Sequence, residues 1–405
     1  VLIHKSFRYR VYPTPAQVER IVAWEHSLRS LWNIAQEQRL LGMARSKDER
    51  RYYTAFDQIN QLKELRAELP WLADVPSDVC GQLLVELDMA WERCFKKLAR
   101  APRWKHKGKG FLSLCETHSN KWRLDGDVIR FPKLGNLRAV IHRPLEGTPK
   151  ACTLKRDGDQ WFATISCVLD VPEPAPRTEP IVAIDRGVVV FGARSDGKPP
   201  IENPEYLLAS MKRLVHADRT VSRRKKGSQN QKKARLHVMR IHRLVRRQRE
   251  YHLHVQSARL AKSHGVVVLE KLNVAGMMRG NCARGIADAG WSAFSRMLEY
   301  KQAWSGGSVE FVNAAYSSQT CSECGCVDRK SRRSQSEFVC TACGHAENAD
   351  VNAAKVLLKR RVNPSALPVE GSLLEGTLRS RKSLRVSRRS AESSALQGRV
   401  DYGKS

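Results

Sequence analysis

Two pairs of cysteines near the carboxyl end constrain the fold of this chain more than any other feature of its sequence. Cys321 and Cys324 form one CxxC unit, and Cys340 and Cys343 form a second after fifteen intervening residues. This spacing is typical of zinc ribbons, in which two tight turns supply four thiolates in tetrahedral geometry. Two redox dithiols are the alternative, but a glycine follows each pair, as in a metal-binding turn. We predict one structural zinc ion, because four thiolates leave no open coordination position.

Three acids form a second candidate set. Asp350 lies seven residues after Cys343, and Asp185 and Glu270 each end an apolar, strand-like stretch. Any one of them alone would be an ordinary surface or capping acid. Three acids from separate elements of one sheet, however, are what a pair of magnesium ions needs to activate water against a phosphodiester. Because carboxylates this close cannot all ionise without cations, we predict a two-magnesium site at these three residues.

The charge of the chain points to a polyanionic partner. Its 405 residues include 71 lysines and arginines against 41 aspartates and glutamates, a formal net charge of +30. That excess favours nucleic acid over an anionic membrane. No apolar run approaches the ~20 residues of a membrane-spanning helix, and no signal-peptide pattern is present, so we expect a cytoplasmic protein. The eleven cysteines show no disulfide-like pattern, which fits a reducing compartment, and Cys326 is a spare thiol that leaves the choice of zinc ligands open.

Residues 212–262 concentrate this positive charge, with only Asp218 and Glu250 as acids. Apolar residues recur through the segment at helical spacing, which leaves the basic side chains on the opposite face. A solvated face is the alternative, but an excess this one-sided favours a surface that contacts phosphates. The predicted nucleic-acid contacts are Arg223, Arg224, Lys225, Lys226, Arg243, Arg246, Arg247 and Arg249.

The hydrophobic pattern changes along the chain and predicts an α+β protein of several domains. Alternation over residues 3–12 predicts a strand, and Thr14 followed by Pro15 predicts the start of a helical region that extends to about residue 100. Asp-Gly turns within 120–170 predict antiparallel hairpins, which the first strand joins. After a proline-rich linker, strands are predicted at 180–185, 188–195, 265–270 and 308–313, and helices at 289–304 and 351–361.

These elements predict five units. They are a small antiparallel β-barrel (1–15 and 118–172), a helical lobe inserted into it (16–117), an α/β nuclease-type domain (173–320 and 345–362) with a basic helical insertion (204–262), a zinc ribbon (321–344) and a disordered basic tail (363–405).

Motifs spread over residues 3–358 carry a resemblance to a known family. They are Tyr12-Pro-Thr-Pro-Ala-Gln17, Trp32-Asn33, Ile184-Asp-Arg-Gly187, Ser222-Arg-Arg-Lys-Lys-Gly-Ser228, Leu269-Glu-Lys-Leu-Asn273, Asp288-Ala-Gly-Trp291, Ser317-Ser-Gln-Thr-Cys-Ser-Glu-Cys-Gly325 and Asn348-Ala-Asp-Val-Asn-Ala-Ala354. Together they resemble TnpB, the transposon-encoded RNA-guided nucleases of the RuvC-like, RNase H type. Miniature type V CRISPR effectors share these motifs, so both identities stay open.

The resemblance implies a magnesium-dependent RNA-guided DNA endonuclease whose partners are a guide RNA and target double-stranded DNA. The barrel would hold the RNA, the RuvC-like part would cut, and the helical lobe would read a short DNA motif beside the target. Asp185, Glu270 and Asp350 match the family's catalytic acids. Arg186 departs from the family, which commonly has a small or apolar residue there, and we expect this cation to reduce metal affinity. Residues expected in the motif-reading region are Tyr53, Ser77 and Gln82.

Two other functions are possible. An RNA-guided or plain DNA-binding repressor would bind without cutting, but the full set of acids favours cleavage. A transposase that performs strand transfer would need a tyrosine site. His252 and His254 resemble the histidine pair of nucleases with a tyrosine nucleophile, but residues two apart diverge on a helix. The guide RNA, the DNA motif and the choice between monomer and dimer are not set by the sequence.

Overall fold

The computed structural model describes residues 1–46, 48–107, 113–280 and 282–362. The predicted disordered tail, 363–405, lies outside the described residues, as does part of the basic turn after Pro102. Within the ranges described, no helix combines the length and apolar character needed to cross a membrane.

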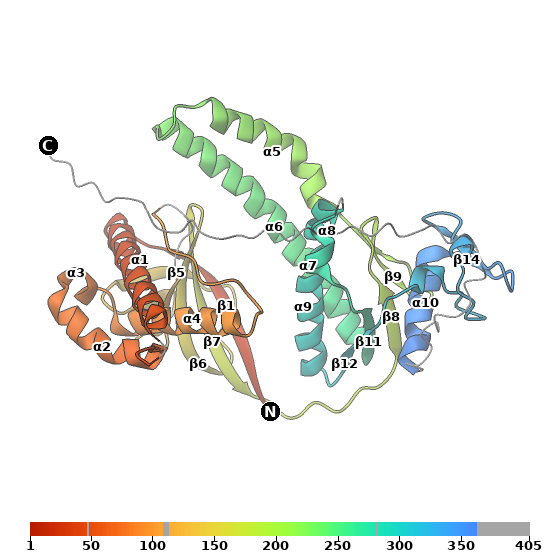
Figure 1. The fold of residues 1–405 in the computed structure, drawn as a ribbon, viewed down its shortest axis with the longest axis horizontal. Coiled ribbons are helices and arrows are strands. Elements are labelled where there is room, and N and C mark those ends of the chain that lie inside the picture. The colour runs from red at the N-terminus through yellow and green to blue at the C-terminus, as the bar shows by residue number, and fades with distance from the viewer. Residues whose placement is uncertain (47, 108–112, 281, 363–405) are drawn as a thin grey trace. The chain divides into compact units, whose positions relative to one another are not determined.

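The amino-terminal part is built on a seven-stranded antiparallel sheet (Figure 1). β1 (Leu2–Tyr12) pairs with both β5 (Gly135–Val140) and β7 (Gln160–Asp170), which confirms that the first strand joins the later hairpins. The remaining strands are β2 (Leu114–Glu116), β3 (Arg123–Asp125), β4 (Val128–Phe131) and β6 (Thr148–Asp157). The predicted hairpin turns place Gly126 and Gly158 at φ values of 57° and 64°, a conformation that glycine adopts without a Cβ clash.

This sheet is a half-barrel, and the prediction of a small barrel was wrong in that respect. Its strand order is β2-β6-β7-β1-β5-β4-β3, and among the described residues the edge strands β2 and β3 do not pair with each other. The physical reason is that helices cover the inner face. Phe7 and Ile165 of the sheet share one hydrophobic core with Trp24 and Leu84 of the helical region, so the sheet buries its apolar side without closing.

The predicted helical lobe consists of α1 (Pro15–Ala44), α2 (Ala55–Glu68), α3 (Pro70–Ala73) and α4 (Ser77–Phe95). α1 starts at the predicted N-cap: the Thr14 hydroxyl accepts from the Gln17 N–H at 3.3 Å, and the Gln17 side chain accepts from the Thr14 N–H at 2.9 Å. α4 ends at Phe95, before the predicted limit of about residue 100, because Lys97 adopts a left-handed φ of 58° that an α-helix cannot contain.

A five-stranded mixed sheet forms the second part of the fold. β8 (Ile181–Asp185) lies at its centre, antiparallel to β9 (Val190–Arg194) on one side and parallel to β11 (Val266–Glu270) on the other. β10 (Ile201–Glu202) and β12 (Ser308–Val312) complete the order β10-β9-β8-β11-β12. The strands predicted after the linker are therefore confirmed.

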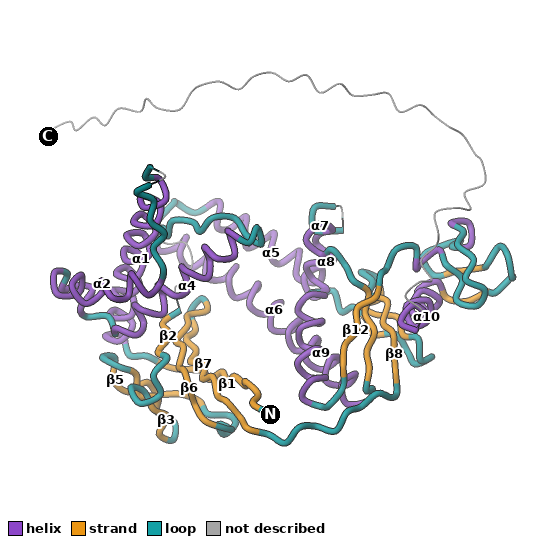
Figure 2. Tube along the Cα trace, turned by 60° about the horizontal axis from the view of Figure 1, so that its bottom comes forward, coloured by secondary structure: helices purple, strands orange, loops and turns teal. Residues whose placement is uncertain are grey.

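Helices cover both faces of this sheet, as Figure 2 shows for α9 (Trp291–Trp304) and α10 (Ala349–Val362). Alternate strand residues explain the two faces. Val182 and Leu269 point into a core shared with α9, α8 (Ala283–Ala289) and the end of α6 (Gln229–Ser263). Ala183 and Val268 point the other way, towards Leu357 of α10. The sheet is thus buried on both sides and holds its strand ends rigidly.

Two further segments connect to this sheet. α5 (Tyr206–Arg223) and α6 form the predicted basic helical insertion, and they pack through Leu214, Ala217 and Ile241. The cysteine module contains two short 3-10 turns, η1 (Ser317–Gln319) and η2 (Arg329–Ser331), and a hairpin of β13 (Glu337–Val339) and β14 (Ala346–Asn348). A short helix, α7 (Val274–Met277), follows β11.

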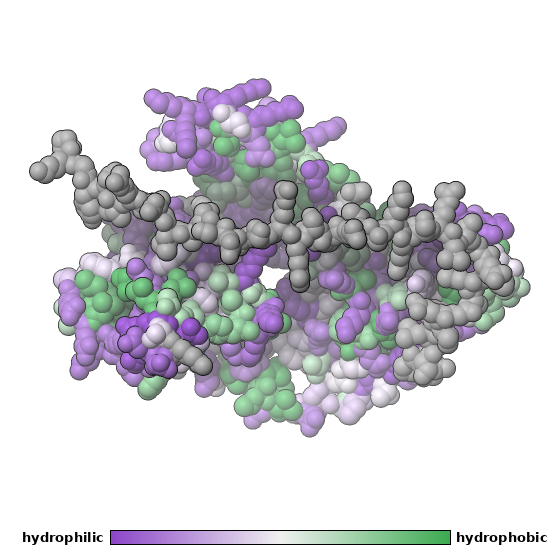
Figure 3. Space-filling view, viewed as in Figure 1, coloured by the Kyte–Doolittle hydropathy of each residue, from purple (hydrophilic) through white to green (hydrophobic). Residues whose placement is uncertain are grey.

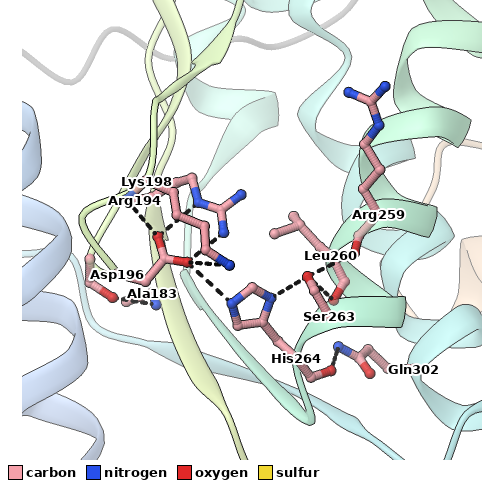
Figure 4. A network of polar contacts seen from close by, with 10 residues as sticks. Ala183, Arg194, Asp196, Lys198, Arg259, Leu260, Ser263, His264 and Gln302 are labelled. Carbon is pink, nitrogen blue, oxygen red and sulfur yellow. Dashed lines mark hydrogen bonds and ion pairs between the residues drawn. The ribbon is translucent and has the colours of Figure 1, made fainter.

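A network of polar contacts around the buried His264 fixes the end of α6 where β11 begins (Figure 4). The Nε2 atom of His264 lies 3.2 Å from Asp196 Oδ2, and its Nδ1 atom lies 2.7 Å from the Ser263 hydroxyl. This order resembles a Ser-His-Asp triad. However, the Ser263 hydroxyl donates to the Arg259 backbone oxygen at 2.8 Å, and Arg194 holds Asp196. Because His264 lies at the opposite end of β11 from Glu270, the network is structural.

Candidate active site and metal centre

Asp185 and Glu270 lie side by side at the carboxyl ends of two adjacent parallel strands. Ile184 of β8 pairs with Leu269 of β11, so the next residue of each strand is one of the two acids. The apolar residues before them are buried on both faces of the sheet, which fixes the direction of each strand. The structure therefore brings these two predicted residues together at one edge of the sheet.

The two carboxyl groups are in an environment that disfavours their charged forms. Glu270 is 5% exposed, and burial raises its pKa, opposed by Arg186. Burial, together with the charges of Glu270 and Asp350, raises the pKa of Asp185 to about 8. Because like charges in a buried site cannot all ionise without counter-charges, this arrangement favours a cation between the acids.

Asp350 approaches the same site from the first turn of α10. The Asn348 side chain caps the helix by accepting from the N–H groups of Asp350 at 3.0 Å and Val351 at 3.2 Å. Arg332, in the loop after η2, donates to Asp350 Oδ1 at 3.0 Å and lowers the pKa of Asp185. Arg332 is thus part of the site, although no motif in the sequence marks it.

Arg186 is a buried link between elements. It is 8% exposed and donates to the Ser295 hydroxyl of α9 at 2.9 Å and to the backbone oxygen of Glu270. Its backbone N–H donates to Glu270 Oε1 at 3.0 Å, and its Nε lies 3.7 Å from the same oxygen. Arg186 therefore orients the Glu270 carboxylate and joins β8 to α9, a role that the sequence did not indicate.

The four predicted cysteines form a compact group. Their sulfur atoms all lie within 4.8 Å of one another, with Cys321 to Cys343 at 3.7 Å and Cys324 to Cys340 at 3.6 Å. Gly325 and Gly344 follow each pair with φ values of 75° and 72°. These left-handed residues let each turn fold back so that both sulfurs face the centre.

Cys326 is outside this group. Its backbone oxygen accepts from the Cys321 N–H at 2.9 Å. Its side chain packs beside the first knuckle, which is the turn that carries Cys321 and Cys324. The donor set that remains, four sulfurs with two backbone N–H groups directed at them, suits a zinc ion held by thiolates. The geometry therefore favours the two CxxC pairs over Cys326 as the zinc ligands.

The cysteine module is fastened directly to the helix that carries Asp350. Asn352 is fully buried; its side chain accepts from the Ser322 N–H at 2.8 Å and donates to the Thr320 backbone oxygen at 2.8 Å. Lys359 also donates to the Ser322 backbone oxygen. The first knuckle is therefore hydrogen-bonded to α10 two residues after the third acid.

The three acids are spaced more widely than the cysteines. In the described ranges, the groups with three or more ligand atoms within 4.8 Å of one another are the four cysteines and a cluster at Asp78, Glu116 and His118, which sequence reasoning missed. Wider spacing suits two ions, since a pair lies about 3.5–4 Å apart and each acid need not contact both. The acids are therefore the residues that could hold a pair of metal ions, whereas the four cysteines form a closed set of donors.

The predicted nucleic-acid contacts fall into two classes. Arg223, Arg224, Lys225 and Lys226 are exposed at the turn between α5 and α6, in the hydrophilic region at the top of Figure 3. The α6 arginines have protein partners: Arg243 donates to Asp159 at 2.6 Å, Arg246 to Asp157, Arg247 to Gln160 at 2.7 Å and Arg249 to the Ala287 backbone oxygen at 3.0 Å. The exposed turn is the part of this surface that needs no rearrangement to meet phosphates.

The three residues expected in the motif-reading region do not share one cavity. Ser77 and Gln82 of α4 line a cavity of about 460 Å³ together with Arg66 and His118. Tyr53 lines a separate, smaller cavity of about 160 Å³, and its ring is covered by Arg51 at 4.7 Å. Ser77 and Gln82 therefore face one cavity, whereas Tyr53 is in a different environment.

The histidine pair is not a nuclease site. His252 and His254 both lie within α6, as expected for residues that diverge on a helix. His252 packs edge-on against Phe191, and His254 contacts the Tyr300 hydroxyl at 3.5 Å.

Three family models match the chain. Residues 291–357 match "Cas12f1-like, TNB domain", residues 164–281 match "Probable transposase" and residues 3–41 match "Helix-turn-helix domain". The last description does not fit the local structure, because residues 3–41 form one strand and part of one long helix.

Similar proteins carry names that refer to RNA-guided DNA cleavage. A Streptomyces pristinaespiralis protein named as an RNA-guided DNA endonuclease is 34% identical over 90% of this chain and 91% of its own length. The similarly named InsQ of Escherichia coli is 32% identical over 72% of this chain and 76% of its own length. Cas12f1 of Sulfoacidibacillus thermotolerans is 46% identical, but only over 14% of this chain and 13% of its own length. A solved Cas12f1 complex with guide RNA and target DNA aligns over 88% of this chain and 98% of its own, at 15% identity and a TM-score of 0.48.

Proposed function

Because this chain belongs to the TnpB family of RNA-guided DNA endonucleases, we propose that it cuts guide-matched double-stranded DNA by two-metal-ion hydrolysis at Asp185, Glu270 and Asp350. The observation that carries the proposal is the meeting of three acids from β8, β11 and α10 at one buried sheet edge, where the other two acids raise the pKa of Asp185. The mixed sheet that holds them fits the RuvC-like, RNase H type.

The protein's own groups would prepare this site for metal. The Arg186 N–H fixes one oxygen of Glu270, Asn348 fixes the start of α10, and Arg332 pairs with Asp350. Two bound magnesium ions would supply an activated water and stabilise the leaving oxygen. In that case Arg332 would be displaced from Asp350 or would turn towards the phosphate.

The remaining parts would deliver the substrate. The exposed basic turn at residues 223–226 would contact the backbone of guide RNA or DNA, and Ser77 and Gln82 would read the DNA motif beside the target. The cysteine module would hold one zinc ion and, through Asn352, keep α10 in place. A transposon-associated nuclease and a miniature CRISPR effector would share all these parts, so sequencing the copurified RNA would separate them.

The test is cleavage of a plasmid that carries a target matched to the copurified RNA and a randomised flank. Wild-type protein with magnesium should cut a subset of flanks, and Asp185→Ala, Glu270→Ala or Asp350→Ala should each abolish cutting but retain binding. Double variants should be little worse than single ones, because the acids act as a unit. Glu310→Ala is the matched control, since Glu310 is an acid of the same sheet that pairs with Arg361 away from the site.

The alternative function is a repressor that binds without cutting. Wild-type protein that binds one flank tightly yet cuts none, in magnesium or manganese, would establish the repressor and remove the nuclease. Calcium should support binding but little cutting, because its longer and looser coordination suits a magnesium site poorly.

A further inference from the structure

A second group of potential metal ligands lies far from the acids of β8 and β11 in the sequence. Asp78 is in the first turn of α4, Glu116 is the last residue of β2, and His118 follows two residues later. One ligand atom from each lies within 4.8 Å of the others, and His118 Nδ1 is 3.0 Å from Asp78 Oδ2. Two carboxylates and an imidazole form a mixed donor set of the kind that zinc accepts.

Glu116 is the unusual member of this group. It is 0% exposed, and its Oε2 atom has no hydrogen-bond partner, whereas Oε1 accepts from the His118 N–H at 3.1 Å. Its carboxyl group lies beside Asp78, with one oxygen of each acid within 4.8 Å of the other. A buried carboxylate oxygen without a partner is costly, and a second acid beside it increases that cost unless a cation or a proton is shared.

The surroundings leave room for a cation to enter. His118 has a side chain that is 59% exposed, so the group is open to solvent on that side. Lys121 places its ammonium 2.5 Å from Asp78 Oδ2, but this side chain is itself 44% exposed and can move into solvent. Lys121 therefore pairs with Asp78 and supplies no donor to Glu116 Oε2.

We propose that Asp78, Glu116 and His118 form a second metal site, for Zn²⁺, which joins the start of α4 to the end of β2. Three protein ligands leave a fourth position for water, as in an open zinc site. β2 is an edge strand of the half-barrel, so the ion would fasten the helical lobe to the edge of the sheet. On the proposed function, the ion would also steady the helix that carries Ser77 and Gln82.

The experiment counts zinc in the full-length protein purified with its RNA. Samples are equilibrated with buffered Zn²⁺, separated from free metal in the same buffer, and measured by elemental analysis. Wild-type protein should hold two zinc ions per chain, and Glu116→Gln and His118→Asn should each hold one, which the four cysteines retain. Glu92→Gln, an exposed acid of α4, is the matched control and should hold two. Lys121→Ala should bind the second ion at lower free zinc, because the competing ammonium is gone.

Three results would overturn the proposal. They are one zinc per chain in the wild type at saturating zinc, a second zinc that both variants retain, and a second zinc that excess magnesium removes, which would indicate a hard-cation site. Should Glu116→Gln fail to fold, the proposal is still tested by the number of zinc ions in the wild type and by the free zinc concentration at which Lys121→Ala binds the second ion. Zinc counting does not depend on cleavage, so this proposal and the nuclease function fail separately.

Discussion

The contact between Asn352 and the first cysteine knuckle offers a direct test of how the third acid is positioned. Asn352→Ala removes the partner of the Ser322 N–H and the partner of the Thr320 backbone oxygen, which are both in buried residues. Each buried group left unsatisfied costs about 1–3 kcal/mol, so the two together weaken docking of the knuckle on α10 by roughly 2–6 kcal/mol. Even the lower figure shifts the docking equilibrium by about 30-fold.

We therefore expect Asn352→Ala to slow cleavage by at least about tenfold, while RNA binding and the zinc content stay at wild-type values. Hydrogen exchange should rise over residues 314–350, which contain the knuckles and Asp350. Lys359→Ala is a milder variant that removes a different contact between α10 and the first knuckle. It removes a bond from an exposed side chain to the Ser322 backbone oxygen, which Asn352 does not contact, so its effect on cleavage should be small.

Two results would contradict this reasoning. Unchanged cleavage in Asn352→Ala, with exchange raised as expected, would show that docking of the knuckle does not position Asp350. Loss of zinc in the same variant would show that the defect acts through the metal ligands, so that the hydrogen bonds to Asn352 could not be held responsible.

Three further predictions concern the metals and the basic surface. Because the pKa of Asp185 is about 8 without metal, a proton competes with magnesium below that pH, and the magnesium concentration for half-maximal cleavage should rise as pH falls from 8 to 6; a flat profile would remove Asp185 as a ligand. Metal-free protein should also lose stability as pH rises from about 4 to 8, because Asp185 keeps its proton in the folded state over this range and has released it in the unfolded state. Thermal melts with a chelator test this. Arg223→Glu with Arg224→Glu should weaken RNA binding for all sequences and reduce the salt slope by about one per lost phosphate contact; binding that stays equally salt-dependent would show that the exposed turn is idle.

Much of the fold could be predicted from the sequence because its elements follow local rules. The N-cap at Thr14, the glycine turns at Gly126 and Gly158, and the apolar strands that end at Asp185 and Glu270 all appear where their patterns indicate. The closure of the first sheet could not be predicted, because it depends on helices that cover the inner face. Alternation shows that a strand has a buried side but does not show what covers it.

The candidate site was only partly predictable, for a related reason. Its acids and cysteines are recognisable by residue type and spacing, whereas Arg332 and Arg186 act through contacts that form only in the folded chain. The partners of the α6 arginines were missed in the same way. Asp157 and Asp159 lie in a hairpin turn more than 80 residues away, so no pattern within the basic segment reveals them.

The three acids of the candidate site are supported in unequal ways, and this inequality has a mechanistic consequence. Asp185 and Glu270 are held by parallel strands that are buried on both faces, so their positions depend on the stability of the sheet itself. Asp350 depends instead on Asn348, Arg332 and the knuckle that Asn352 fastens, all within or beside the cysteine module. A metal ion bound by the cysteines would also stabilise the fold of that module. Removal of zinc should therefore reproduce the loss of Asp350 and leave the other two acids in place. Cleavage would be lost together with the pairing of Arg332 and Asp350, whereas the sheet would keep its protection against hydrogen exchange.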